Sequence, residues 1–161
     1  MRGAMIASAL LAAVLGGGAC YPDAADWSGR TELMDASSAG RTTRVRIMLE
    51  QGADVDAQDA CGLTSLMVAS SAGHTEVVKL LLEYDANVLL ETIHGDTALM
   101  HAIGSGNPDV VRLLLEYGAY TTVREGSRNR GVPYGETALE VAERMGHGEI
   151  AGLLRQAEDY D

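Results

Sequence analysis

The sequence has few of the residues that fill large protein cores or bind nucleic acids. Its 161 residues include no Phe, one Trp and three Pro, so Leu, Ala, Val and Met must fill the core. Asp and Glu outnumber Lys and Arg by 23 to 12, for a net charge of −11. Phosphate binding needs many cations, so we expect no nucleic acid partner. The length suits one compact domain or one short repeat array.

Cysteine is also scarce, since only Cys20 and Cys61 occur. Two cysteines are too few for the disulfide framework of a small secreted domain. A bridge between them is open if Cys20 survives processing. Otherwise Cys61 is a lone thiol, and no cation lies next to it in the sequence to activate it.

Residues 1–20, MRGAMIASALLAAVLGGGAC, differ from the rest of the chain. They have one early cation, an apolar middle and a small-residue end, which is the pattern of a secretory signal peptide. Ala19-Cys20 also resembles a bacterial lipobox, although Gly17 stands where Leu is usual, so lipidation of Cys20 and ordinary cleavage stay open. Either route predicts a protein of the bacterial periplasm or cell envelope, with a lipid on Cys20 as its only membrane attachment.

An internal repeat begins at Gly29, Gly62 and Gly95, with a fourth copy at Gly135. The first three copies read GRTELMDASSAGRTTRVRIMLEQGAD, GLTSLMVASSAGHTEVVKLLLEYDAN and GDTALMHAIGSGNPDVVRLLLEYGAY, and the fourth reads GETALEVAERMGHGEIAGLLRQA. The offsets are 33, 33 and 40 residues. A fixed period of this size indicates stacked supersecondary units that share one core.

Each copy predicts two helices joined by a tight turn. A Thr can cap the first helix, and Leu and Ala three residues apart share its buried face. A Gly then ends this helix in the left-handed conformation. The second helix has a broad apolar face, which must be covered on more than one side. The capping residues are Thr31, Thr64, Thr97 and Thr137, and the glycines are Gly40, Gly73, Gly106 and Gly146.

With these motifs, the chain resembles the ankyrin repeat family from Trp27 to about Ala157. GHTEVVKLLLEYDANV and NPDVVRLLLEYGA resemble its second helices, and QGADVDAQDACGLTSL resembles its hairpin. The resemblance implies an all-α repeat fold: an ankyrin-like solenoid of four helix-turn-helix repeats with hairpin loops. The expected repeats lie near residues 29–61, 62–94, 95–134 and 135–157, within a domain over 21–157 that an acidic tail, 158–161, follows.

Two departures from the family pattern affect stability. The family's Thr-Pro-Leu-His start has lost its Pro and His in all four copies, and Met34, Met67 and Met100 stand in the His position. Met is adaptable enough to fill that space, but the hydrogen bonds of His are lost. Asp85 stands where Gly52 and Gly118 suggest a left-handed residue, so we expect strain there.

A search for catalytic and metal sites finds little. His74 and His147 follow turn glycines, where family histidines tie the turn, so we interpret both as structural. His94 and His101 with Asp96 are the only grouping that suits a metal, and solvated histidines are far commoner than ligands. No nucleophile elbow, phosphate loop or zinc-protease motif occurs in the sequence. We expect a monomeric protein that is not an enzyme and has no metal or cofactor.

The expected function is binding of a protein partner through the concave face of the solenoid. The family's variable positions map onto the hairpin tips, onto the ends of the first helices and onto one edge formed by Trp27 and Arg30. The tip residues are Ala60, Cys61, Leu63, Ile93, His94, Asp96, Tyr134 and Glu136, and the helix-end residues are Ser38, Ser71, Ser105, Arg144 and Met145. Trp27 is equally well interpreted as a cover for the open end of the core.

The fourth offset adds seven residues to the last hairpin, which forms a long loop over 122–134 with Arg124, Arg128 and Arg130. We expect it to be the only positive patch, able to grip a carboxylate or phosphate of the partner. The alternative interpretation is a solvent-exposed loop whose arginines only pair with nearby carboxylates. The alternative function is a redox-sensing or stress-protective protein that uses Cys61 and oxidisable Met residues.

Overall fold

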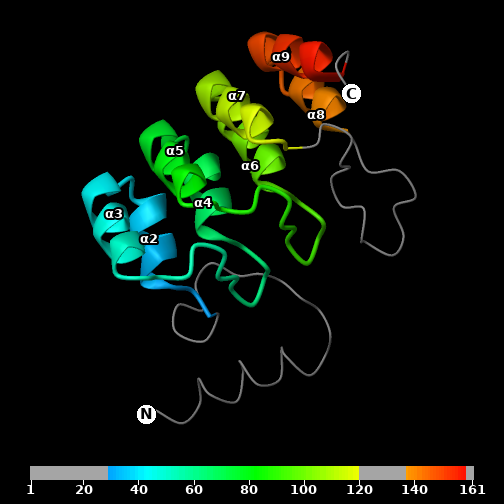
Figure 1. Ribbon diagram of the computed structural model, residues 1–161. Coiled ribbons are helices and arrows are strands. Elements are labelled where there is room, and N and C mark those ends of the chain that lie inside the picture. The colour runs from blue at the N-terminus through cyan, green and yellow to red at the C-terminus, as the bar shows by residue number, and fades with distance from the viewer. Residues whose placement is uncertain (1–28, 120–136, 159–161) are drawn as a thin grey trace, which may run out of the picture.

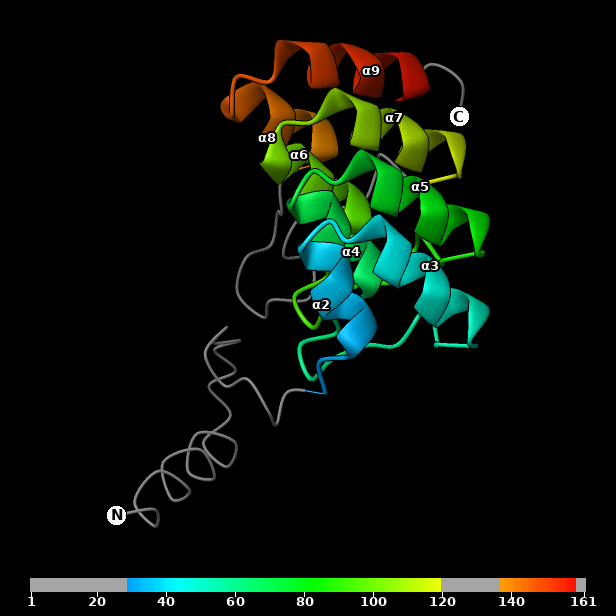
Figure 2. The same ribbon diagram turned by 90° about the vertical axis from the view of Figure 1, so that its left-hand side faces the viewer.

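The computed structural model describes residues 29–119 and 137–158, and within them the chain forms eight helices in four antiparallel pairs (Figure 1). The first helices of the pairs pack side by side in one row, and the second helices form another row (Figures 1 and 2). The pairs are α2 (Glu32–Ser38) with α3 (Thr42–Glu50), α4 (Ser65–Ser71) with α5 (Thr75–Glu83), α6 (Ala98–Ser105) with α7 (Pro108–Glu116), and α8 (Ala138–Arg144) with α9 (Gly148–Glu158).

The expected all-α repeat fold is therefore confirmed, with no strand in the described ranges and one isolated bridge, between Glu91 and Thr97. The first hairpin loop (residues 51–64) and the second hairpin loop (residues 84–97) project to the same side of the helix rows (Figure 1). None of the described helices is long and apolar enough to cross a membrane.

Threonine caps begin the first helices largely as the sequence predicts. The hydroxyl oxygens of Thr31, Thr64 and Thr137 each accept a hydrogen bond from the backbone N–H three residues on. Thr97 occupies the same position, but its hydroxyl makes no capping bond and no other hydrogen bond to described residues. Each cap satisfies a donor that the helix start leaves without a partner.

Met34 takes over part of the role of the missing family histidine. Its sulfur accepts a hydrogen bond of 3.4 Å from the backbone N–H of Thr31, while Thr31 caps the N–H of Met34. The two residues thus form a reciprocal capping box, with a thioether as a weak acceptor. The side chains of Met34 and Met67 are buried, as filling that space requires.

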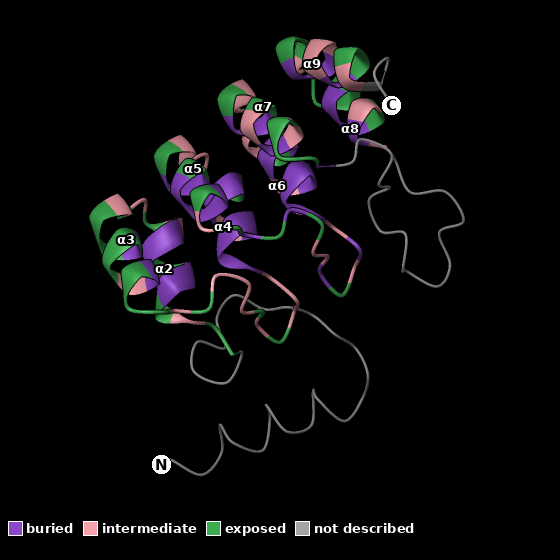
Figure 3. Cartoon of the chain, in the orientation of Figure 1, coloured by how far each residue is buried: buried purple, intermediate pink, exposed green. Residues whose placement is uncertain are grey.

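The core lies where the two rows of helices face each other and where neighbouring pairs meet (Figure 3). The alanines of the four first helices, Ala36, Ala69, Ala102 and Ala142, are all buried and let adjacent helices approach closely. In α5 the five apolar residues from Val77 to Leu82 are all buried, because α3 and α7 pack on either side. In α3, at the first end of the array, only Val45 and Leu49 are buried.

Side chains at the turn between paired helices tie each repeat to the one before it. His74 donates through Nε2 to the carbonyl oxygen of Ser38 at 3.0 Å, and its ring packs against Gly40. Asn107 takes this position in the next repeat and donates to the carbonyl of Gly73 at 3.0 Å. The structural interpretation of His74 is thus confirmed. His147 packs in the same way against Gly106, but its Nε2 has no hydrogen bond to described residues.

Candidate functional site

The first helices and the first hairpin loop surround a groove of about 320 Å³. Its lining comes from three successive repeats, and it brings together four residues of the predicted binding face: Arg30, Ser38, Leu63 and Ser71. The other lining residues are Met67, Val68, Ala72 and His101. Apolar side chains from the hairpin loop and α4 therefore lie between polar groups from α2 and α6.

Arg30 is fixed at the α2 side of the groove. Its Nε donates to Asp35 Oδ1 at 2.6 Å, and a terminal nitrogen donates to Ser38 Oγ at 3.3 Å. The carboxylate of Asp35 balances the charge of Arg30. This side of the groove therefore presents an ion pair and the Ser38 hydroxyl, and its net charge is close to zero. The pair is exposed, and its net contribution to stability is at most about 1 kcal/mol.

The first hairpin loop holds Leu63 in place through Asp59. One carboxylate oxygen of Asp59 accepts hydrogen bonds from the backbone N–H groups of Cys61 and Leu63, at 2.8 and 2.9 Å. The backbone N–H of Ile93 donates to the carbonyl of Cys61 at 2.9 Å, which joins the two hairpin loops. The loops therefore form a connected wall beside the groove.

His101 of α6 lines the far end of the groove and is largely buried. Burial lowers the pKa of its imidazole below the ordinary value of 6.5, and the negative charge of Asp96 opposes this effect only in part. Its Nε2, like Oδ1 of Asp96, has no hydrogen bond within the described part of the chain. This nitrogen is itself shielded from solvent, so the neutral imidazole lines the groove without offering Nε2 to an incoming group.

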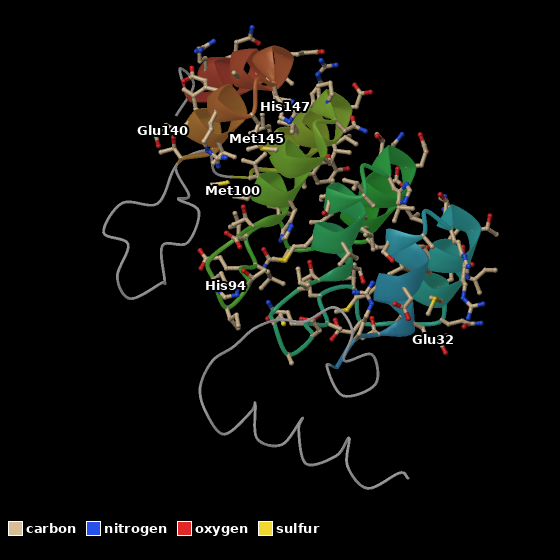
Figure 4. The ribbon with its side chains drawn as sticks, turned by 180° about the vertical axis from the view of Figure 1, so that it is seen from behind. Glu32, His94, Met100, Glu140, Met145 and His147 are labelled. Carbon is tan, nitrogen blue, oxygen red and sulfur yellow. The ribbon has the colours of Figure 1, made fainter. Side chains whose placement is uncertain are left out.

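The second hairpin loop carries Ile93, His94 and Asp96, none of which lines the groove. Thr92 Oγ1 orders this tip by accepting hydrogen bonds from the N–H groups of His94 and Asp96, at 3.2 and 3.1 Å. Figure 4 shows His94 on this projecting loop. Ile93 is 49% exposed, so this tip presents an apolar side chain to solvent beyond the groove.

The remaining predicted residues fall into two groups. Arg144, the last residue of α8, and Met145, which follows it, are both exposed in the last repeat. The hydroxyl of Ser105 donates a hydrogen bond to the carbonyl of Ala102 in its own helix, α6. Ala60 is exposed on the first hairpin tip. Several predicted residues lie outside the described ranges: Trp27, Arg124, Arg128, Arg130, Tyr134, Glu136 and the lipidation candidate Cys20.

The expectation of a single positive patch is wrong. Arg41, Arg44 and Arg46 are all exposed on or next to α3. Arg41 and Arg44 line a second hollow, of about 840 Å³, with Thr43 and Ile47 among its other residues. Arg44 pairs with Glu32 at 3.2 Å. The signal was available in the sequence, because three of the 12 Lys and Arg residues fall within six positions, 41–46.

Cys61 is half-buried and is bonded in a disulfide. Of the two states that the sequence left open for Cys61, a disulfide and a lone thiol, the structure has the disulfide. In this state the residue presents no thiolate, which is the reactive form, and a role of Cys61 in redox sensing stays a prediction. Among the Met residues, Met34 and Met67 are buried, whereas Met145 is 43% exposed.

Within the described ranges, no group of three or more His, Cys, Asp or Glu residues is arranged to hold a metal ion. A family model described as ankyrin repeats (3 copies) matches residues 33–125 and 94–161. No curated protein matches the chain.

Proposed function

Because the chain belongs to the ankyrin repeat family, whose repeats generally mediate protein–protein interaction, we propose that it binds a protein partner through the groove across α2, α4 and α6. The observation that carries the proposal is the lining of this groove, where Leu63, Met67 and Val68 lie between Arg30 and His101. An apolar side chain of the partner would enter between the two polar ends, and a polar group at its edge would bond to the exposed Ser71.

The projecting hairpins extend the proposed surface. Leu63 and Ile93 lie on adjacent, hydrogen-bonded tips, and an exposed Ile93 suits a partner's apolar contact. The predicted arginine-rich loop, residues 122–134, falls outside the described ranges, between Ala119 and Thr137, and these two residues occupy the same repeat positions as Ala86 and Thr97 in the second hairpin loop. This equivalence supports a role for Arg124, Arg128 and Arg130 beside the same partner, as grips on carboxylates or phosphates.

We also propose that residues 1–20 direct export and that the protein works in the periplasm or cell envelope of a bacterium. The disulfide at Cys61 supports this location, because disulfides persist in oxidising compartments and are rare in the cytosol.

The test captures partners from a bacterial envelope extract with the C-terminally tagged chain and two single variants. Ser71→Arg places a long cation in the groove, at the exposed end of α4. Thr43→Arg makes the same charge change on exposed α3, in the other row of helices. We expect to capture a partner protein that binds the wild type and Thr43→Arg but does not bind Ser71→Arg. Titration of the purified partner against each purified variant should reproduce this loss of binding.

A third variant, with Arg124, Arg128 and Arg130 all changed to Glu, separates the loop from the groove. Loss with this variant alone would place recognition on the loop. Identical capture by all three variants and the wild type would contradict the proposed surface.

A further inference from the structure

We propose that the outer face of the first repeat is a second binding surface, and that it holds an acidic helix of another protein. This face is formed by α2 and α3 at the first end of the described array (Figures 1 and 3). It surrounds the hollow of about 840 Å³ that Arg41, Arg44 and Ile47 help to line. The hollow shares no lining residue with the groove across α2, α4 and α6, so the two surfaces can be tested separately.

The repeat register shows that this is the face on which a preceding repeat would stack. A shift of 33 residues places Ile47 at the position of Leu80, and Arg44 at the position of Val77. Leu80 and Val77 are both buried, and α3 packs against their helix. Ile47 is 47% exposed, and Met48 is only partly buried. The first repeat therefore keeps an apolar centre on a face that a helix covers in the next repeat.

Arg41 occupies the position from which later repeats bond to the repeat before them. One shift of 33 residues places it at His74, which donates to the carbonyl of Ser38. A second shift places it at Asn107, which donates to the carbonyl of Gly73. Arg41 itself has no ion pair or side-chain hydrogen bond within the described ranges. Its guanidinium can donate to whatever covers the face, and a carboxylate matches its paired N–H groups best.

The charge of the face favours an acidic occupant. The lining of the hollow contains two arginines and one carboxylate, Glu32, which pairs with Arg44 at 3.2 Å. Arg46 adds another exposed cation on α3. An anionic membrane suits the face less well, because it would also meet residues 53–119, whose two cations and ten carboxylates give a net charge of −8. A single acidic helix can contact the first repeat alone.

The two ends of the described array differ. Arg155 of α9 stands at the position of Leu82, which is buried in α5, and it pairs with Glu143 of α8. Charged groups at an end face keep a repeat array soluble. At the first end, Ile47 lies exposed beside Arg41, and an apolar centre with a polar rim is the composition of a protein interface. A helix fits this face because α3 and α5 cover the equivalent faces of α5 and α7.

The first test measures binding of a labelled peptide to the purified full chain by fluorescence anisotropy. The peptide has about 16 residues, enough for partial helicity, with leucines three and four positions apart on one face and with alanine and glutamate elsewhere. One control peptide has lysine in place of glutamate, and the other has glutamine in place of leucine. We expect the acidic leucine peptide to bind at least about tenfold more tightly than either control. Equal binding of either control, or no binding of the acidic peptide, would overturn the proposal.

Two matched pairs of variants locate the site. Arg41→Glu and Arg46→Glu make the same charge change at exposed positions, but only Arg41 lines the hollow. Ile47→Gln and Ile93→Gln remove isoleucines of nearly equal exposure, 47% and 49%, from α3 and from the second hairpin tip. We expect Arg41→Glu and Ile47→Gln each to weaken binding of the acidic peptide about tenfold or more, and each control variant to weaken it less than about threefold.

Three results would contradict the proposed surface. Equal losses within a pair would mean that the peptide responds to overall charge or hydrophobicity, and a loss with Ile93→Gln alone would move binding to the hairpin tips. A dimer in analytical ultracentrifugation that Ile47→Gln abolishes would show that a second copy of the chain covers the face. Binding of phosphatidylglycerol vesicles that Arg41→Glu abolishes, with no binding of the peptide, would show that a lipid surface is the occupant. None of these variants changes the groove lining, so failure here is distinct from failure of the groove proposal.

Discussion

Asp85 shows how a single residue departs from the repeat at a measurable cost. Its φ of 60° makes it the only left-handed residue other than glycine in the described ranges. Gly52 and Gly118 occupy the equivalent positions with φ of 85° and 84°. The sequence predicted this strain from alignment alone, because the backbone at this turn is set by the fold and an L-residue there meets its own carbonyl.

Changing Asp85 to Gly should stabilise the protein by up to about 1 kcal/mol. This is a net effect, because the change removes backbone strain from the folded state but also gives the unfolded chain more conformational entropy. Thermal melting should rise by a few degrees. The matched control is Gly52→Asp, where a new Cβ meets nothing within 4 Å, so only backbone strain is added and melting should fall. An unchanged melting temperature in both variants would contradict the account.

His101 gives the fold a dependence on pH. Burial lowers its folded pKa below the unfolded value of 6.5, so the unfolded chain binds more protons in that window and acid favours unfolding. The stability that His101 contributes is present above about pH 6.5 and is lost as the pH falls through the lowered folded pKa.

Urea unfolding at pH 7.5 and pH 5.5 should therefore show a larger loss for the wild type than for His101→Gln, which cannot titrate. His94→Gln, on the half-buried hairpin tip, serves as the control and should retain the wild-type loss. An equal loss in His101→Gln and the wild type would show that other groups carry the dependence on pH.

At the scale of the element, Asn107 performs two tasks that substitution can separate. Its Oδ1 caps α7 by accepting from the N–H of Asp109 at 3.0 Å, and its Nδ2 donates to the carbonyl of Gly73 in the preceding repeat. The cap was predictable from the Asn-Pro-Asp pattern. The tie to Gly73 was not, because it depends on the distance between two repeats that share no local sequence signal.

Asn107→Asp keeps the cap and removes the bond to Gly73, since a carboxylate cannot donate to the carbonyl and repels it. The hydroxyl of Thr75, which accepts from Asn107 Nδ2 at 3.3 Å, can still donate to the carboxylate. We expect a loss of roughly 1 kcal/mol or more, and about 1 kcal/mol further for Asn107→Ala, which also removes the cap. Denaturant unfolding measures both. If Asn107→Asp were as stable as the wild type, the bond to Gly73 would contribute nothing to the stacking.

The limits of prediction follow the same division between local and non-local signals. Caps and turn glycines depend on a few neighbouring residues, so the repeat predicted Thr31, Thr64 and Thr137 correctly. Thr97 has the same backbone angles as Thr64 within a few degrees and yet makes no cap, which the sequence pattern gives no means to foresee. Met34 was expected only to fill space, and its sulfur also accepts a hydrogen bond.

The groove shows the same limit at the scale of the whole molecule. Position in the repeat placed Ser38 and Ser71 on the concave side, but it did not identify Val68, Ala72 or His101 as lining. Which neighbours enclose a hollow depends on how closely three helices approach. The solenoid itself was predictable, because four registered copies must stack to cover their apolar faces.

Charge is distributed unevenly along this solenoid. The first repeat, residues 29–52, has four arginines against three carboxylates. Residues 53–119 have two cations against ten carboxylates, for a net charge of −8. Like charges held close together destabilise the compact state, and salt screens them over about 10 Å at 0.1 M. We therefore expect thermal stability to rise as sodium chloride increases from about 0.01 M to 0.3 M.

Two matched variants locate the source of this repulsion. Glu83 and Glu50 are both exposed and end the second helices of adjacent repeats, so Glu83→Lys and Glu50→Lys change the net charge equally at equivalent positions. Glu83→Lys relieves repulsion in the acidic middle and should raise the melting temperature at low salt. Both new lysines stand four residues after a cation, Arg46 or Lys79, but Glu50→Lys also adds to a repeat that already carries Arg41 and Arg44, so it should give a smaller rise or a fall. Equal effects would mean that net charge alone, and not its distribution along the array, sets the repulsion.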